Sequence, residues 1–298
     1  MKKILLSISL ISAGTFFAQQ QIGNSNFEEW ENVGNDTEEP LNWNSFKSGE
    51  GSLANLSAKQ VERSTSIRSG ASGSYCARIW SRSVLGVVAN GNMTVGRINM
   101  GSSTANSPNN YNSTKIGEEN FSEALTSRPD SLVFWVKYTP VNGSSKARVH
   151  AILHDNYAFR DPIDANSQPH TVARAELNYN STAGSWVRKS VPFVYSGPAE
   201  TVEYILISFS TNETPGGGSG NDEVLIDDVQ LIYNSVSITE LNNKWWVSYN
   251  ENGVNLHGIE APFTVTNIAG QKVNPKSILP SGIYVVNVNG STQKLLVP

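Results

Sequence analysis

The chain has 298 residues, a formal net charge of −4 at pH 7 and only 16% charged residues. This acidic balance argues against a nucleic-acid partner, because nucleic acids select basic surfaces. Cys76 is the single cysteine, which excludes an intramolecular disulfide and a cysteine-based zinc site. We therefore expect Cys76 to be a small buried apolar residue.

Residues 1–18 have the pattern of a cleaved secretory signal peptide. Lys2 and Lys3 form a positive segment, and residues 4–13 are mostly apolar. This run is too short for a permanent membrane span, and no later segment has eighteen consecutive apolar residues. We expect a mature protein without a transmembrane segment, either secreted or held at the cell surface on the external face of the outer membrane.

Residues 21–234 are predicted to form one all-β domain. Short runs of Val, Ile, Tyr, Phe and Trp alternate with turn-forming residues, and no segment has a convincing amphipathic helical pattern. The clearest strands are 74–80, 131–138 and 147–153, and Asn142-Gly143 predicts a hairpin turn between the last two. Strands at this spacing predict a β-sandwich of jelly-roll type.

Each of these three strands alternates between an apolar face and a face with aromatic and cationic side chains. Sugars bind to flat aromatic faces flanked by polar groups. If the three strands share a sheet, their mixed faces form one sugar-binding patch. The alternative is that Trp80 and Trp135 belong to the core, since tryptophans are more often packed than exposed. The predicted patch consists of Arg78, Trp80, Trp135, Lys137, Arg148 and His150.

The segment 154–170 is the strongest candidate for catalysis. It contains His154, Asp155, Arg160, Asp161, Asp164 and His170. Glycoside hydrolysis needs two carboxyl groups about 5 or 6.5–9.5 Å apart, and His with Asp can ligate a transition metal. However, Asp161-Pro162 and Gln168-Pro169 are turn signals, and a long hairpin loop is polar by default. The segment is therefore a candidate for either catalysis or ligand contact.

Other catalytic patterns are missing from the sequence. There is no Gly-x-Ser-x-Gly, no His-Glu-x-x-His and no phosphate-binding loop. Residues 101–112 are rich in Ser and Asn, and residues 214–218 are rich in Gly, so both are predicted to be loops.

Three motifs within residues 24–234 carry a family resemblance. They are Asn26-Phe27-Glu28-Glu29-Trp30, the strand 132–138 and the closing segment 225–231. In this order they resemble the "putative carbohydrate metabolism domain" of surface proteins from Bacteroidetes. The first and last are similar, more loosely, to carbohydrate-binding modules of the galactose-binding sandwich type. The resemblance implies sugar contact without a defined reaction.

The same resemblance implies a structural calcium ion. In the sandwich modules, an acidic residue of the first strand meets an Asp of the last strand, and Ca²⁺ takes six to eight oxygen ligands. The matching positions are Glu28 and Asp228, with Asp227 beside them. The alternative is that these carboxylates are solvated or hydrogen-bonded groups at strand ends.

Residues 235–298 are predicted to form a separate, small immunoglobulin-like β-sandwich. They resemble the type A sorting domain of the type IX secretion system, which implies the secretion machinery as a partner and removal or lipid attachment on export. The alternative is an accessory domain with Trp245 and Trp246 as an exposed pair. The motifs that carry the resemblance are Gly270-Gln271-Lys272-Val273, Leu279-Pro280-Ser281-Gly282-Ile283-Tyr284 and Lys294-Leu295-Leu296-Val297.

These patterns together predict a noncatalytic carbohydrate-binding protein, secreted or at the cell surface, whose ligand is a polysaccharide or oligosaccharide. Two alternatives stay open. One is a glycan-active hydrolase that uses the segment 154–170. The other is a structural, adhesin-like surface protein.

Overall fold

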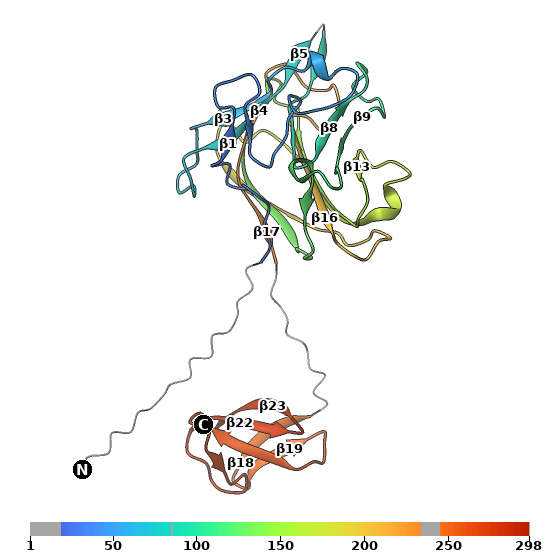
Figure 1. Cartoon of the computed structure of the whole chain (residues 1–298). Helices are drawn as coiled ribbons and strands as arrows, with labels where there is room; N and C mark the ends of the chain where they lie inside the picture. Colours follow the sequence, from blue (N-terminus) through green and yellow to red (C-terminus); the bar gives the residue numbers. More distant parts are fainter. Residues whose placement is uncertain (1–18, 85, 234–244, 298) are drawn as a thin grey trace, which may run out of the picture. The chain divides into compact units, whose positions relative to one another are not determined.

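The computed structural model describes residues 19–84, 86–233 and 245–297 (Figure 1). They belong to two compact units, which divide between Asn234 and Ser235. The paired strands run antiparallel, and the helical segments of the described ranges are short 3-10 turns. The prediction of an all-β protein is therefore confirmed. No helix in these ranges has the length and apolar character needed to cross a membrane.

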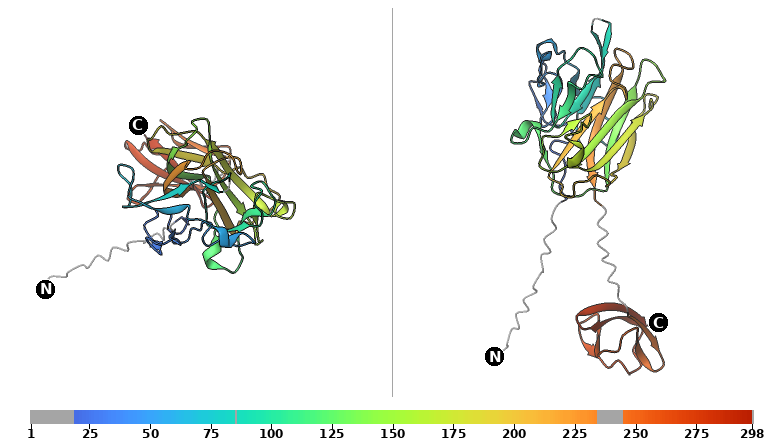
Figure 2. Two further views of the ribbon diagram at one scale, coloured as in Figure 1. Left: turned by 90° about the horizontal axis from the view of Figure 1, so that it is seen from above. Right: turned by 90° about the vertical axis from the view of Figure 1, so that its right-hand side faces the viewer.

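Two five-stranded sheets form the body of the first unit (Figure 2). Sheet I has the order β10-β16-β12-β14, with β7 also paired to β16, and sheet II has the order β15-β11-β17-β4-β3. The strands of sheet I are β7 (Asn92–Thr94), β10 (Glu123–Ala124), β12 (Ala147–His154), β14 (Thr171–Tyr179) and β16 (Tyr204–Ser210). Those of sheet II are β3 (Val61–Ser64), β4 (Cys76–Trp80), β11 (Ser131–Thr139), β15 (Val187–Pro192) and β17 (Glu223–Ile232).

A single hydrophobic core lies between the two sheets. Alternate residues of β4, β11 and β12 point into it, and these are Ala77, Ile79, Leu132, Phe134, Val136, Tyr138, Ala147, Val149, Ala151 and Leu153. Aromatic rings connect the sheets: the Phe134 ring of β11 lies 5.2 Å from the Phe209 ring of β16, measured between centroids, and Trp43 lies 6.0 Å from Phe209. The predicted inward faces are thus confirmed.

The predicted hairpin between β11 and β12 is wrong. Asn142 accepts a hydrogen bond from the backbone N–H of Ser145 at 2.9 Å, so a turn is present. However, β11 pairs with β15 and β17, whereas β12 pairs with β14 and β16. The turn carries the chain from one sheet to the other, because both apolar faces bury against the same core from opposite sides.

Smaller elements surround the two sheets of the first unit. A three-stranded sheet has the order β13-β9-β8. Its strands are β8 (Arg97–Met100), β9 (Asn110–Ser113) and β13 (Arg160–Asp161). Two hairpins pair β1 (Trp30–Glu31) with β2 (Glu39–Pro40) and β5 (Arg82–Val84) with β6 (Val87–Ala89). The 3-10 turns are η1 (Ala54–Leu56), η2 (Glu119–Phe121) and η3 (Gln168–His170).

The segment between β12 and β14 packs against the outer face of sheet I. Phe159 contacts Ile152 and Leu206 there in a separate small apolar cluster. Next to it, His154 is fully buried, and burial lowers its pKa to about 4. This neutral imidazole bonds Thr114 Oγ1 at 2.8 Å through Nε2 and the Asp155 carbonyl at 2.8 Å through Nδ1. His154 therefore ties the start of this segment to Thr114.

The second unit has its own sheet and core. Its sheet has the order β21-β20-β22-β23, and a separate hairpin pairs β18 with β19. Trp245 is buried in the core, whereas Trp246 is 56% exposed and stacks on His257 with 3.7 Å between ring centroids. The two tryptophans therefore do not form an exposed pair. The strands are β18 (Trp246–Asn250), β19 (Gly253–His257), β20 (Phe263–Asn267), β21 (Lys272–Val273), β22 (Gly282–Val288) and β23 (Ser291–Val297).

Candidate functional site

A cleft of about 780 Å³ lies over the outer face of sheet I. Side chains of β7, β12 and β16 form its floor. The small sheet β13-β9-β8 borders the cleft, as do the β5–β6 hairpin and the turn η1. The segments predicted as loops complete its rim through residues such as Ala105 and Gly216.

The alternation of β12 and β16 decides which part of sheet I remains open. Across the two strands Ile152 faces Leu206, and this apolar pair is covered by Phe159. The next two outward pairs are polar: His150 faces Ser208, and Arg148 faces Ser210. Because the polar pairs are not covered by the apolar cluster, they form the floor of the cleft.

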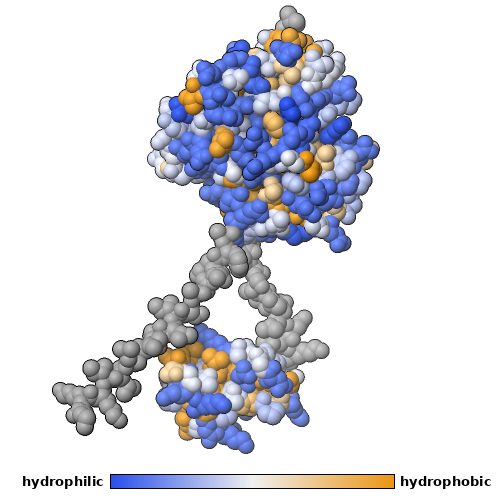
Figure 3. All heavy atoms as spheres, in the orientation of Figure 1, coloured by the Kyte–Doolittle hydropathy of each residue, from blue (hydrophilic) through white to orange (hydrophobic). Residues whose placement is uncertain are grey.

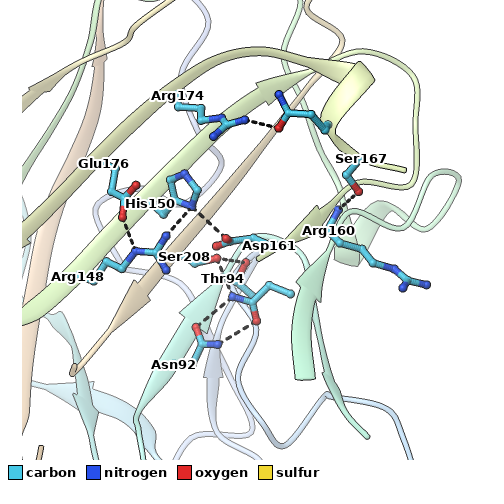
Figure 4. Close-up of polar contacts among 12 residues, drawn as sticks. Asn92, Thr94, Arg148, His150, Arg160, Asp161, Ser167, Arg174, Glu176 and Ser208 are labelled. Atoms are coloured by element: carbon cyan, nitrogen blue, oxygen red, sulfur yellow. Dashed lines mark hydrogen bonds and ion pairs between the residues drawn. The ribbon is translucent and has the colours of Figure 1, made fainter. Parts of the chain in front are cut away.

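A histidine–aspartate pair lies in this floor (Figure 4). His150 is only 4% exposed, and its Nδ1 lies 3.0 Å from Asp161 Oδ1 and 3.1 Å from Arg148 Nη2. A carboxylate can only accept, so the bond to Asp161 places a proton on Nδ1. Arg148 is held in turn by Glu176, with 2.9 Å between Nε and Oε1. The His150 Nε2 atom is buried without a hydrogen-bond partner among the described residues.

Asp161 is an ionised carboxylate at neutral pH. Burial acts to raise its pKa, but the facing His150, the hydrogen bond between the two and the nearby Arg148 together hold the pKa below the ordinary value. A general acid must be protonated at working pH. Asp161 does not meet this requirement.

Neutral polar side chains continue the floor beside the histidine (Figure 4). Asn112 of β9 accepts a hydrogen bond from Asn92 Nδ2 at 2.9 Å and donates one to Ser208 Oγ at 2.7 Å. Amides and hydroxyls both donate and accept, as sugar hydroxyls do. Tyr111 also lines the cleft, with the Arg160 guanidinium 4.2 Å above its ring centroid.

The six residues predicted as one sugar-binding patch are divided between two surfaces. Arg78, Trp80, Trp135 and Lys137 share the outer face of sheet II, whereas Arg148 and His150 lie in the cleft on sheet I. The prediction of a single patch is wrong because β12 pairs with no strand of sheet II. The assignment of faces was correct: both tryptophans are directed away from the central core.

On sheet II, arginines occupy the ring faces that a sugar would need. The Arg78 guanidinium lies 4.6 Å from the Trp80 ring centroid, and Arg68 lies 4.6 Å from that of Trp135. Trp80 is buried beneath this cover. Cys76 on the same face is fully buried, as expected, and burial raises the pKa of its thiol to about 12. This face is therefore a weaker candidate for a ligand site than the cleft.

The predicted calcium ligands lie near each other, but protein groups hold both. Glu28 Oε1 accepts hydrogen bonds from the backbone N–H groups of Ser74 and Tyr75 at 2.9 and 2.8 Å. Asp228 is paired with Arg68 and accepts a hydrogen bond from the Ser72 hydroxyl. The positive charge next to Asp228 thus comes from Arg68. A calcium ion could bind Asp228 only if the Arg68 guanidinium moved away. In the part of the chain that the structure describes, no three His, Cys, Asp or Glu side chains gather as metal ligands.

Sequence reasoning did not single out Asn92, Asn112 or Ser208. They are far apart in the chain, and Asn112 fell at the end of a segment predicted to be a loop. In the structure Asn112 is part of β9 and lies directly opposite Asp161 of β13. The pairing of β9 with β13 brings these residues together in the floor, and no local sequence pattern predicts this long-range pairing.

The fold of the first unit is similar to that of a solved protein described as "a putative glycoside hydrolase from Bacteroides thetaiotaomicron". The two share 18% sequence identity at a TM-score of 0.52, over 74% of this chain and 72% of that one. A second "putative glycoside hydrolase", from Bacteroides vulgatus, shares 17% sequence identity at a TM-score of 0.47, over 70% of this chain and 96% of that one. The family 11 carbohydrate-binding module from Clostridium thermocellum shares 17% sequence identity at a TM-score of 0.32, over 68% of this chain and 96% of that one. No protein-family model and no curated protein matches the chain.

Proposed function

We propose that the first unit binds a glycan in the cleft over sheet I without cleaving it. The observation that carries this proposal is the floor of neutral amides and hydroxyls around His150, whose Nε2 lacks a partner among the described residues. A concave site with a few convergent polar groups is typical of a small-ligand site. Donor–acceptor side chains suit a ligand rich in hydroxyl groups.

Noncatalytic binding is favoured because the carboxylates near the floor already have partners. Asp161 is bonded to His150, and Asp164 accepts the Ser167 backbone N–H at 2.7 Å and pairs with Arg160. Hydrolysis remains the second candidate, because Asp161 does reach the cleft. Release of reducing sugar by the wild type that is lost in Asp161→Asn would favour the hydrolase.

Asn112→Ala is expected to weaken glycan binding by about three- to tenfold, because it removes hydrogen-bonding capacity worth about 1 kcal/mol from the floor. A glycan array identifies the ligand, and titration calorimetry measures the change. Trp135→Ala on the opposite sheet is the control and should leave the affinity unchanged.

Two outcomes would contradict this assignment. If binding is lost in Trp135→Ala and retained in Asn112→Ala, the site lies on sheet II. If no glycan binds at all, the structural, adhesin-like interpretation replaces the proposal.

We further propose that the first unit is a jelly roll and that the second is an immunoglobulin-like sorting module of the type IX secretion system. In this proposal residues 1–18 direct export and residues 235–298 direct release or attachment at the cell surface. The chain should then reach the medium or the outer membrane, and a chain without residues 235–298 should stay in the periplasm. Immunoblotting of the periplasm, outer membrane and medium measures where each form is found. Equal export of both forms would refute the sorting role.

A further inference from the structure

The cleft has an apolar side as well as a polar floor. Three of its lining side chains are strongly exposed: Leu56 at 75%, Val87 at 47% and Val84 at 45%. Leu53, Val88 and Met100 line the same cleft. Single exposed apolar residues are ordinary, but several around one cleft mark a binding surface. Figure 3 shows apolar side chains at the tip of the β5–β6 hairpin, near the top of the view.

Hydrogen bonds fix this apolar side in place. The Gln60 amide donates to the carbonyls of Trp80 and Ala89, both at 2.9 Å, which ties the base of the β5–β6 hairpin to β4. The backbone N–H of Leu53 donates to the Met100 carbonyl at 3.0 Å, which ties the turn η1 to β8. The apolar side is therefore built into the fold next to the polar floor.

The shape of these side chains indicates what they contact. Sugar rings stack on flat aromatic faces, whereas the exposed residues here are branched aliphatic ones. Tyr111 is an aromatic side chain of the cleft, and an arginine covers one of its faces. Branched aliphatic side chains surround a methyl group better than they support a flat ring. The floor next to them supplies hydroxyl partners.

The charges near the floor do not select an acidic sugar. Arg148 is paired with Glu176, and Arg160 lies 3.6 Å from Asp164, measured between Nη1 and Oδ2. These pairs leave no unbalanced positive charge to attract a uronic acid. The distinguishing feature of the cleft is therefore its apolar side.

We propose that the cleft selects glycans that carry methyl-bearing groups, either O-acetyl esters or 6-deoxy sugars. This inference rests on the proposed glycan binding and names the class of glycan. The sugar hydroxyls bond Asn92, Asn112 and Ser208, while the methyl group packs against Leu56, Val84 and Val87.

Matched ligand pairs test the proposal on the full chain. Acetylated xylo-oligosaccharides are compared with the same material after alkaline deacetylation, and fucose- or rhamnose-bearing oligosaccharides with their 6-hydroxylated counterparts. We expect the methyl-bearing member of one pair to bind about fourfold more tightly for each methyl group buried. The pair that shows the preference identifies the source of the methyl group.

The double variant Val84→Thr, Val87→Thr keeps the side-chain shape and makes the apolar side polar. It should lower the ratio of the two affinities toward one, because hydroxyl groups replace two of the three apolar contacts of the methyl group, with Leu56 kept. Val141→Thr, at a similarly exposed valine outside the cleft, is the matched control and should keep the preference.

Equal affinity for both members of every pair would overturn this proposal while glycan binding itself stands. No binding to any glycan would overturn both. A dimer in solution that the double variant dissociates would assign the apolar side to self-association, and would also overturn the methyl-group proposal.

Discussion

Phe209→Ala is expected to lower the free energy of unfolding of the first unit by about 3–5 kcal/mol. Phe209 is fully buried between the sheets, and its ring contacts those of Trp43 and Phe134. The substitution removes apolar contacts and leaves a cavity that the surrounding strands cannot fill completely. Scanning calorimetry measures the change.

Val194→Ala is the control, because Val194 is an exposed residue whose backbone bridges to Arg174. Its effect should stay within about 0.5 kcal/mol. A similar loss in both variants would show that the core between the sheets does not dominate stability. Ser208 and Ser210 flank Phe209 and form part of the cleft floor. The proposed glycan binding should therefore be lost at a lower temperature in Phe209→Ala than in the wild type, because the variant unfolds earlier on heating.

Asp227→Asn is expected to remove a loss of stability that the wild type shows between about pH 4 and 7. Burial and the neighbouring charge of Asp228 raise the pKa of Asp227 from 3.8 to about 7. The folded state then binds more protons than the unfolded state in this window, so stability falls as pH rises. The difference between 3.8 and about 7 corresponds to about 4 kcal/mol. Urea unfolding at pH 5 and pH 8 measures the part of this loss that falls between the two pH values, about 2.5 kcal/mol.

Asp161→Asn is the matched control at a second buried aspartate. Its pKa is held below 3.8, so its contribution is complete at both pH values and is lost only as pH falls below that range. The variant should keep the loss of stability that the wild type shows between pH 5 and pH 8, because Asp227 is unchanged in it. If wild type and Asp227→Asn have the same pH dependence, Asp227 is ionised in the folded protein.

The predicted binding of calcium by Glu28 and Asp228 can also be tested through protein stability. A cation bound by Glu28 and Asp228 would favour ionised carboxylates and stabilise the fold, by about 2.7 kcal/mol at a hundred times its Kd. The unfolding temperature at pH 8 should then rise in CaCl₂ relative to EDTA, and Asp228→Asn should abolish the rise. An unchanged temperature would contradict calcium binding and leave Arg68 as the partner of Asp228.

The cleft depends on how the two sheets divide the strands. Sheet II buries aromatic and cationic side chains against each other on its outer face, with Arg78 and Arg68 on Trp80 and Trp135. Sheet I instead leaves two polar rows open, and the segment after β12 supplies Asp161 to them. The same two-sheet domain thus presents one closed and one open outer face.

The sequence by itself determined the local structure. Strict alternation along β4, β11 and β12 identified which side chains face the core, because successive residues of a strand point to opposite sides. It also identified Cys76 as buried and named Arg148, His150 and Asp161 among its candidates.

Only the tertiary structure decided which strands are neighbours. Alternation is the same whichever sheet a strand joins, so it could not separate His150 from Trp135 or place Asn112 beside Ser208, 96 residues away. Pairing is decided by burial of every apolar face against one shared core, which is a property of the whole domain. That division moved the candidate site from a patch of tryptophans to a cleft with a polar floor and an aliphatic side.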